Sequence, residues 1–360
     1  MRAAVCYEFG QPLVIDEVEL DEPGRGEVRV KIAAVAICHS DVHLIRGEWG
    51  GELPVVAGHE AAGIVDAVGE GVDSVQPGDH VIVSLLRSCG HCFYCTTGSP
   101  YVCESQFSLR TETRLHTPAG EPILQGINCG AFAEYAVVHQ SQLVLVDDEL
   151  PLDSLALLAC GVITGAGAVI NTGGVRPGES VAVIGTGGVG LNAVQGAALA
   201  GANPIIALDL LDSKLEAARA FGATHALNAA DPELPARVRA LTGGRGPDYA
   251  VVTVGSVAAI EQALRLVRRE GTVVVAGMPH VDASFALPVY RFVGSGRRIV
   301  GSVMGSTRLH VDVPRFVELY QQGRLKLDQL ISNRYPLESI NAAIESMESG
   351  QALRNVIVFD

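Results

Sequence analysis

Two patterns of hydrophobic and polar positions divide the chain. Up to about residue 148, short apolar or alternating runs at 27–33, 63–68, 80–85 and 133–138 are separated by Gly, Pro and Asp turns. Such runs predict β-strands, so this part is expected to be β-rich. From about residue 151, strand-like runs at 180–185, 204–210, 249–255 and 272–278 alternate with alanine-rich helical stretches. That alternation predicts an α/β domain with a doubly wound parallel sheet.

The final segment returns to a mixed pattern. It predicts helices over 312–321 and 336–350 and a strand over 355–359, and we expect it to pack back on the first domain. A chain of 360 residues is long enough for two domains. With no long linker between them, the active site is expected to lie between the two.

A glycine-rich turn follows the first strand of the α/β part. The run at 181–184 leads into Gly185, Gly187 and Gly190, and a helix-prone segment continues over 191–200. This is a GxGxxG arrangement in the context that dinucleotide binding requires. Gly185 permits the tight turn, Gly187 lets the backbone approach a pyrophosphate, and Gly190 lets the helix pack closely on the strand.

An acidic residue at the end of the next strand selects the dinucleotide. Asp209 stands 19 residues after Gly190, where its carboxylate would accept hydrogen bonds from the ribose hydroxyls of an adenosine. The same carboxylate would repel a 2′-phosphate, which favours NAD over NADP. Lys214 is close enough along the chain to add a ribose contact.

Four cysteines lie within 15 residues: Cys89, Cys92, Cys95 and Cys103. The close spacing lets four thiolates meet at one ion, and four sulfurs with no open position describe a structural zinc. An iron–sulfur cluster is the alternative, but the spacing of the fourth cysteine differs from a ferredoxin run and Glu104 follows it in place of proline. Buried free cysteines would explain one such residue better than four.

Composition and charge exclude some classes of protein for this chain and argue against others. Hydrophobic residues make up 48% of the chain and charged residues 18%, which excludes a disordered chain. The net charge of −14, without a basic cluster, argues against nucleic acid as a partner. Eight cysteines are too few for a secreted disulfide framework, and no signal-type or membrane-spanning apolar run is seen. A soluble, cytoplasmic protein with no membrane partner is expected.

A second group of potential ligands is dispersed along the chain. It consists of Cys38 in a Cys-His-Ser-Asp run, His59 in Gly-His-Glu, and Cys160 in Ala-Cys-Gly. Each residue alone is more typical of a packed core. Together, two cysteines and one histidine form a known ligand set for a catalytic zinc with one position left open.

With these motifs in order, the chain resembles the zinc-dependent alcohol dehydrogenases of the medium-chain dehydrogenase/reductase family over nearly its full length. The resemblance implies a GroES-like β-rich catalytic domain over 1–161 and 303–360, with the structural-zinc lobe at 89–103. It implies a Rossmann NAD-binding domain over 162–302. It also implies NAD as the cofactor and two zinc ions per subunit, one catalytic and one structural.

The same resemblance assigns the residues of the catalytic zinc site. Cys38, His59 and Cys160 would hold the ion, and Glu60 would lie beside it as an occasional ligand. Asp41 would orient His59 and so fix the tautomer of the imidazole.

Proton transfer and cofactor binding are also assigned by the resemblance. Ser40 would contact the substrate hydroxyl, and His43 would form the solvent end of a proton relay through the nicotinamide ribose. His39 and Arg354 would bind the pyrophosphate. The remaining cofactor contacts would be Thr164, Gly185, Gly187, Gly188, Val189, Gly190, Asp209 and Lys214.

The family has two branches that this chain could join. Segments 132–135 and 170–173 resemble the thiol-dependent formaldehyde dehydrogenases. The glutathione-dependent members carry an acidic pair where this chain has Trp49 and Gly51, and a tyrosine in place of His43. Mycothiol-dependent members stay open as an alternative. The expected pocket walls are apolar and favour a primary aliphatic or aromatic alcohol: Trp49, Leu85, Phe132 and Met278.

Other readings of the same fold explain less of the sequence. A zinc-free reductase or a non-catalytic binding protein would not need Cys38, His59 and Cys160 together. A zinc-scaffold interaction module would leave the nucleotide fingerprint unexplained. For assembly, a strand over 298–304 is expected to continue a sheet across a two-fold axis, which favours a homodimer over a homotetramer.

Overall fold

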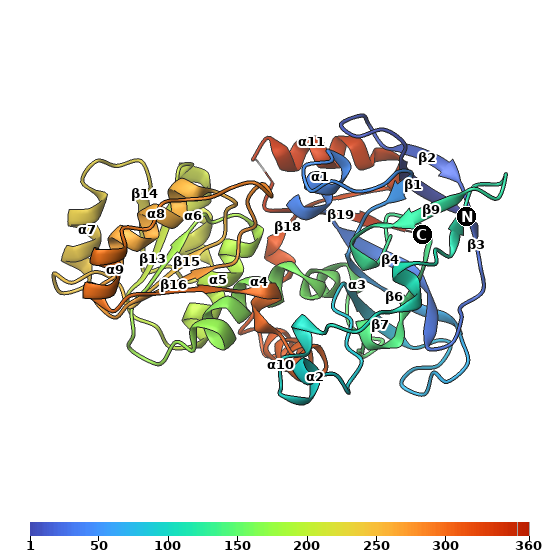
Figure 1. Cartoon of the computed structure of the whole chain (residues 1–360), viewed down its shortest axis with the longest axis horizontal. Helices are drawn as coiled ribbons and strands as arrows, with labels where there is room; N and C mark the ends of the chain where they lie inside the picture. Colours follow the sequence, from blue (N-terminus) through green and yellow to red (C-terminus); the bar gives the residue numbers. More distant parts are fainter. Residues whose placement is uncertain (351, 360) are drawn as a thin grey trace. The chain divides into compact units, whose positions relative to one another are not determined.

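A computed structural model of the chain describes residues 1–350 and 352–359 (Figure 1). The chain divides into two compact units. The first unit comprises Met1–Cys160 and Arg308–Asp360, and the second comprises Gly161–Thr307. The chain therefore leaves the first unit once and returns to it.

The first unit is rich in β-structure. Its helices are α1 (His39–Ile45), α2 (Phe93–Thr96), α3 (Leu152–Leu155), α10 (Leu309–Gln321) and α11 (Ile340–Glu348). Its strands are β1 (Arg2–Cys6), β2 (Val14–Glu17), β3 (Glu19–Leu20), β4 (Glu27–Ala36), β5 (Val55–Val56), β6 (Glu60–Val68), β7 (His80–Ser84), β8 (Leu115–His116), β9 (Pro122–Gln125), β10 (Tyr135–His139), β11 (Leu143–Leu145), β18 (Ile331–Tyr335) and β19 (Arg354–Val358).

Two sheets organise these strands. One has the order β2-β1-β5-β9-β8-β3, and the other has the order β11-β7-β6-β4-β19-β18 with β10 also paired to β4. The long strand β4 pairs with β6 over most of its length, with β10 through its first half and with β19 through its last residues. The C-terminal strand therefore lies in the same sheet as strands from the start of the chain.

The core of the first unit is filled by alternate residues of these strands. Val28, Val30 and Ile32 of β4 are buried on one face, as the period-2 pattern of a half-buried strand requires. Phe132 is also fully buried, and a side chain at Gly58 would collide with its ring. Phe132 is therefore a core residue. Its side chain, predicted to line the substrate pocket, has no exposed surface in this structure.

The second unit is an α/β domain. Its strands are β12 (Val181–Ile184), β13 (Ile205–Asp209), β14 (His225–Asn228), β15 (Tyr249–Val252), β16 (Thr272–Val275) and β17 (Arg298–Gly301). Its helices are α4 (Gly161–Gly167), a π-helical turn at Ala168–Gly173, α5 (Gly188–Leu199), α6 (Asp212–Ala220), α7 (Leu234–Leu241), α8 (Val257–Leu266) and α9 (Val289–Ser295).

All six strands of the second unit run parallel in the order β14-β13-β12-β15-β16-β17. This is the order of a Rossmann fold, with the reversal between β12 and β15. The runs Val-Ala-Val-Ile and Thr-Val-Val-Val are rich in β-branched residues and almost wholly buried, as is typical of strands covered on both faces. The predicted doubly wound parallel sheet is confirmed.

Some element boundaries differ from the sequence prediction. Strand β14 was not predicted because its sequence, His-Ala-Leu-Asn, has no apolar run. The strand expected over 298–304 ends at Gly301, since Met304 and Gly305 take left-handed conformations in the turn Val303–Ser306. Gly305 needs to be glycine because a side chain there would lie 2.0 Å from the carbonyl oxygen of Ile163.

Within the described residues, no single helix has the length and apolar character needed to cross a membrane. The segments Leu152–Ala159 and Gly161–Gly173 satisfy that test only when they are taken together as a bent pair.

The buried carboxylate of Glu27, at the start of β4, is hydrogen-bonded to residues of the segment before β8. The side chain of Glu27 is 1% exposed and accepts hydrogen bonds from Arg114 Nε (2.8 Å), Ser108 Oγ (2.8 Å) and the Gly24 backbone N–H (2.9 Å). Burial raises the pKa of the Glu27 carboxyl, but these hydrogen bonds outweigh it, so the pKa lies below its ordinary value. The ionised form is therefore the one that the fold stabilises.

We expect Glu27→Gln to lower the free energy of unfolding by on the order of 2 kcal/mol at neutral pH, because it removes one charge of a buried pair. Since the folded pKa is depressed, this contribution is complete above the unfolded value of about 4.3 and is lost as the pH falls through the folded value. Denaturant titrations at pH 7 and at pH 4 measure it. Glu22→Gln is the control, because Glu22 is 80% exposed in its pair with Arg29. An equal effect of the two variants would contradict the assignment.

Candidate active site and metal centres

Three segments of the first unit bring four potential metal ligands together. Cys38 caps the N-terminus of α1, His59 and Glu60 open β6, and Cys160 follows the turn Ala156–Ala159. Their ligand atoms lie within 4.8 Å of one another. Ser84 Oγ donates to the Ala159 carbonyl over 2.7 Å, which fastens the segment before Cys160 to β7.

The carboxylate of Asp41 organises two of these segments. Its Oδ2 accepts from the Cys38 backbone N–H over 3.1 Å, and its Oδ1 accepts from the Gly58 N–H over 2.9 Å and from His59 Nδ1 over 2.8 Å. A carboxylate only accepts, so His59 carries its proton on Nδ1 in this contact. The orientation leaves Nε2 as the atom able to bind an ion, as expected for a metal-ligating histidine.

The residues present fit a zinc ion. The Nε2 atom of His59 is buried and has no hydrogen-bond partner, a costly state that a metal bond would relieve. Hydrogen bonding from Cys160, with a further contribution from His59, lowers the pKa of the Cys38 thiol well below its ordinary value despite burial. The same contact with Cys38, together with burial, raises the pKa of Cys160. Two sulfurs and one imidazole nitrogen match a catalytic zinc with an open position.

Glu60 and Arg354 form a buried ion pair beside these ligands. Arg354 Nη2 donates to Glu60 Oε2 over 2.5 Å, and both side chains are at most 5% exposed. Burial raises the pKa of the Glu60 carboxyl to about 7, although Arg354 opposes the shift. The other Glu60 oxygen and the Nε of Arg354 are buried without partners. Arg354 is predicted to bind the pyrophosphate of the cofactor. In the structure its guanidinium is hydrogen-bonded to Glu60.

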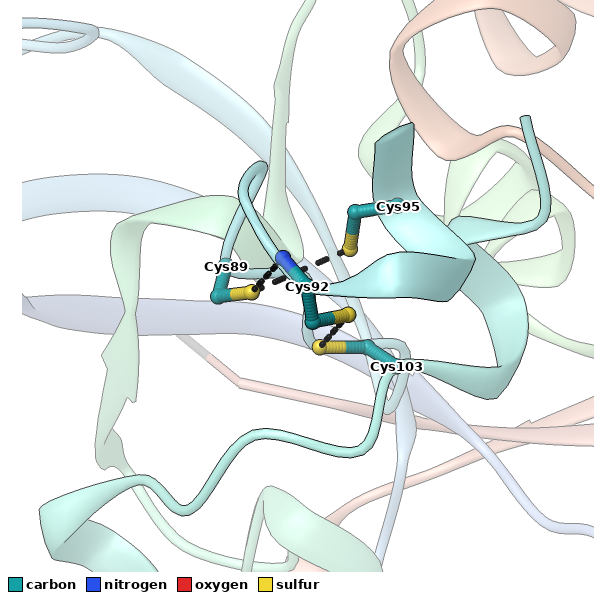
Figure 2. A group of neighbouring side chains, drawn as sticks. All are labelled: Cys89, Cys92, Cys95 and Cys103. Atoms are coloured by element: carbon teal, nitrogen blue, oxygen red, sulfur yellow. Dashed lines mark hydrogen bonds between the residues drawn. The ribbon is translucent and has the colours of Figure 1, made fainter. Parts of the chain in front are cut away.

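The second metal group is the four-cysteine lobe (Figure 2). The Sγ atoms of Cys89 and Cys95 lie 4.0 Å apart, and those of Cys92 and Cys103 lie 3.8 Å apart. Disulfide sulfurs would be about 2.0 Å apart. Sulfurs bound tetrahedrally to one zinc at about 2.3 Å would be about 3.8 Å apart. The four thiols therefore fit a closed tetrahedral zinc site.

In the second unit, the three glycines of the GxGxxG motif are needed for different physical reasons. Gly185 has φ +87°, and a side chain there would lie 2.3 Å from Val254. A side chain at Gly190 would lie 1.8 Å from the Gly185 carbonyl oxygen. At Gly187 the backbone is extended, and a side chain there would meet no protein atom within 4 Å. The open space at the N-terminus of α5 fits the close approach of a pyrophosphate.

Asp209 lies at the carboxyl end of β13, the edge at which the glycine turn follows β12. One of its oxygens accepts from the backbone N–H of Thr186 (2.7 Å) and from the Thr186 hydroxyl (3.1 Å). The other accepts from the N–H groups of Leu210 and Leu211. Thr186 is a contact that the sequence reasoning missed, because the fingerprint leaves the residue between the first two glycines unspecified.

The other predicted residues are distributed over both units. Ser40 and His43 lie on α1 with Cys38 at its cap, and His39 is exposed at the start of that helix. Trp49 stacks on His43 with ring centroids 5.0 Å apart, and Leu85 follows β7. In the second unit, Thr164 lies on α4, Gly188 and Val189 open α5, Lys214 is buried on α6, and Met278 is 63% exposed.

Comparison with known proteins adds the family. Residues 24–148 match the family model of the alcohol dehydrogenase GroES-like domain, and residues 188–322 match that of the zinc-binding dehydrogenases. The chain is 40% identical to an NDMA-dependent alcohol dehydrogenase of Amycolatopsis methanolica, over 99% of this chain and 98% of that protein. It belongs to the zinc-dependent medium-chain alcohol dehydrogenase family. The predicted family, its two-domain fold class and the enzyme class, an oxidoreductase acting on alcohols, are confirmed.

Two further similar proteins are named for different substrates. The S-(hydroxymethyl)glutathione dehydrogenase of Saccharomyces cerevisiae is 36% identical over 99% of this chain and 96% of that protein. The crystal structure of benzyl alcohol dehydrogenase from Acinetobacter calcoaceticus superposes with a TM-score of 0.93 at 32% identity, covering 100% of this chain and 99% of that one.

We expect Asp41→Asn to weaken zinc retention at the Cys38–His59–Cys160 site by about 10- to 100-fold, the usual cost of losing a partner of a metal-bound histidine. The amide can supply only one oxygen where the carboxylate supplies two. Zinc content after graded chelator competition measures the loss. One zinc per chain should be retained in the four-cysteine lobe.

Two variants control this experiment. Asp16→Asn changes an acid that accepts from the Tyr7 hydroxyl and the Glu17 N–H, away from both ligand groups, and it should retain both zinc ions. Cys103→Ser should lose the other ion and lower the melting temperature, because a structural zinc contributes directly to folding. Loss of the same ion in D41N and C103S would show that the two sites had been assigned incorrectly.

Proposed function

We propose that the chain is an NAD-linked alcohol dehydrogenase with a catalytic and a structural zinc, which oxidises primary aliphatic or aromatic alcohols to aldehydes and catalyses the reverse reduction. One observation supports it most strongly. Two cysteine sulfurs and a histidine nitrogen without any other partner meet at one buried point. Glu60, the fourth potential ligand, is paired with Arg354, and the three remaining protein ligands would leave a zinc position open for substrate.

The residues of the first unit have separate roles in this proposal. Cys38, His59 and Cys160 would hold the zinc, which when bound supplies a Lewis acid that favours loss of the alcohol proton. Asp41 holds His59 in the tautomer that presents Nε2. Ser40 would accept the proton of the alcohol, and His43, which is partly exposed, would deliver it to water.

The second unit would bind the dinucleotide. The turn at Gly185–Gly187 and the N-terminus of α5 would face the pyrophosphate, and Asp209 would bind the adenosine ribose. The bound nicotinamide supplies the acceptor for the hydride that leaves the alcohol carbon. Asp209 is held by Thr186 and by the N–H groups after β13, so contacts within the protein fix its carboxylate.

A thiol-dependent formaldehyde dehydrogenase is the second candidate. The yeast relative is named for a glutathione adduct. In this chain Trp49 occupies one of the positions at which the glutathione-dependent members carry an acid, and its indole stacks on His43. An apolar ring at that place suits an aromatic or aliphatic alcohol better than the amino group of glutathione.

The deciding experiment is a panel of NAD reductions, with zinc content determined on the same preparation. The substrates are aliphatic alcohols, benzyl alcohol, and formaldehyde with and without glutathione or mycothiol. NDMA is included as an alternative acceptor because one relative is named for it. Thiol-independent turnover of alcohols supports the proposal. Turnover only in the presence of a thiol would overturn it in favour of the second candidate.

The proposed assembly is a homodimer with a small molecule as the only other partner. In the described chain, β17 pairs with β16 alone and forms one edge of the parallel sheet. An unpaired edge can extend a sheet by pairing with the same strand of a second copy.

We expect Asp209→Ala to weaken binding of NADH by about 10-fold or more, because it removes a charged hydrogen-bond acceptor. The same change should improve NADPH binding, since the negative charge that opposes a 2′-phosphate is gone. Titrations of both cofactors by protein fluorescence give the two dissociation constants. Asp212→Ala, which removes an exposed acid three residues later, should leave their ratio unchanged. An unaltered ratio in D209A would refute the role of Asp209.

A further inference from the structure

Helix α1 ends in a hydrogen-bonded stop that folds the following residues back on the helix. The Gly47 N–H donates to the Leu44 carbonyl over 2.9 Å, and the Glu48 N–H donates to the His43 carbonyl over 3.0 Å. Gly47 has φ +71°. These two bonds and the left-handed glycine define a Schellman motif. Glycine is required at this position for two reasons. Its φ is positive, and a side chain there would lie 2.9 Å from the ring of Phe9.

This motif brings the side chains of Glu48 and His43 together. The residue after the left-handed glycine usually makes a hydrophobic contact with the third residue from the helix end. Here those two positions hold a carboxylate and an imidazole, and His43 Nδ1 lies 2.5 Å from Glu48 Oε2. A polar pair thus replaces the apolar contact that would stabilise the stop more simply.

The imidazole of His43 is held from a second direction by Trp49. The two rings are stacked, with an interplanar angle of 28° and centroids 5.0 Å apart. Glu48 therefore fixes the edge of the imidazole and Trp49 covers one face. The side chains of His43 and Glu48 remain 27% and 33% exposed, so the pair is in contact with solvent.

We propose that Glu48 is a positioning residue for proton transfer by His43, a role that rests on the proposed dehydrogenase function. Because a carboxylate accepts only, the neutral imidazole keeps its proton on Nδ1 and presents the lone pair of Nε2. During oxidation Nε2 takes up the proton that leaves the alcohol through Ser40, and the imidazolium carries its charge beside the Glu48 carboxylate. The Nε2 proton then passes to water, which restores the starting tautomer without net change in Glu48.

The other ionisable groups around this helix end do not duplicate the contact. His39 lies one turn before His43 on α1, and Arg46 lies one turn after it. Arg46 is paired with Glu348 of α11. Among the described carboxylates, Glu48 is the one hydrogen-bonded to His43.

The test uses Glu48→Leu and Glu48→Gln. Leucine removes the acceptor but supplies the hydrophobic contact usual for a Schellman motif, so E48L should keep its melting temperature and zinc content. Glutamine retains an acceptor oxygen without the charge. ¹⁵N spectra of histidine-labelled enzyme without cofactor, with the His43 signals assigned from H43Q, report which nitrogen carries the proton.

We expect the wild type and E48Q to keep the His43 proton on Nδ1, and E48L to shift it toward Nε2. In alcohol oxidation kcat should fall on the order of 10-fold in E48L, a fraction of the roughly 100- to 10,000-fold that a positioned proton-transfer group contributes. KM should change little, and E48Q should recover part of kcat. Asp21→Leu removes the comparable surface contact with His116 Nε2 (2.9 Å) and should leave kcat unchanged.

The outcomes separate this inference from the function on which it rests. If H43Q turns over alcohol as fast as the wild type, the relay role proposed for His43 fails, and Glu48 has no proton transfer to assist. If H43Q is impaired but E48L retains both the tautomer and kcat, the role of Glu48 is overturned and the relay stands. A shifted tautomer with unchanged kcat would also overturn it. A fall in the melting temperature of E48L that E48Q does not share, with kcat lowered in proportion to folded protein, would mark Glu48 as structural.

Discussion

The Asp41 carboxylate is the contact on which the candidate active site depends. It accepts hydrogen bonds from the backbone of Cys38 and Gly58 and from the ring of His59, so one side chain sets the distance between two segments and the tautomer of a ligand. Asp41 and His59 are both completely buried, and a charge in that environment is tolerated only when it is paired and hydrogen-bonded. One carboxylate therefore sets the position of two of the metal ligands, Cys38 and His59, relative to each other.

In the second unit, the carboxylate of Asp209 also holds a loop by accepting several hydrogen bonds. Asp209 accepts from Thr186 on one side and from two backbone N–H groups on the other, which fixes the glycine turn relative to the end of β13. At the end of α1, Glu48 holds the His43 ring in a similar manner. Asp41 and Asp209 each hold a short loop through backbone N–H groups, whereas Glu48 holds only a ring.

Sequence patterns predicted the parallel sheet well, because buried β-branched runs such as the one in β16 have few alternatives. The spacing of four cysteines indicated one ligand group, whereas the dispersed group came from the family resemblance; in the structure the potential ligand atoms of each group lie within 4.8 Å of one another. Sequence patterns give less information where tertiary contacts decide the structure. His225–Asn228 is a strand because β13 pairs with it, not because of its composition. Phe132 is in the core because Gly58 leaves room for its ring, and Glu48 meets His43 through a helix stop whose glycine alone is visible in the sequence.

The discontinuous first unit has a consequence for how the protein is made. β19 pairs with β4, and Arg354 supplies the partner of Glu60, so both contacts join residues that are far apart in the sequence. A ribosome must release residues 354–358 before either contact can form, whereas the second unit is contiguous and ends at Thr307, 47 residues before Arg354. During synthesis the nucleotide fold can therefore close first, while the segment that contains Cys38, His59 and Cys160 waits for its final strand. The first unit therefore stays incomplete for longer during synthesis than the second, although its first strand is made earlier.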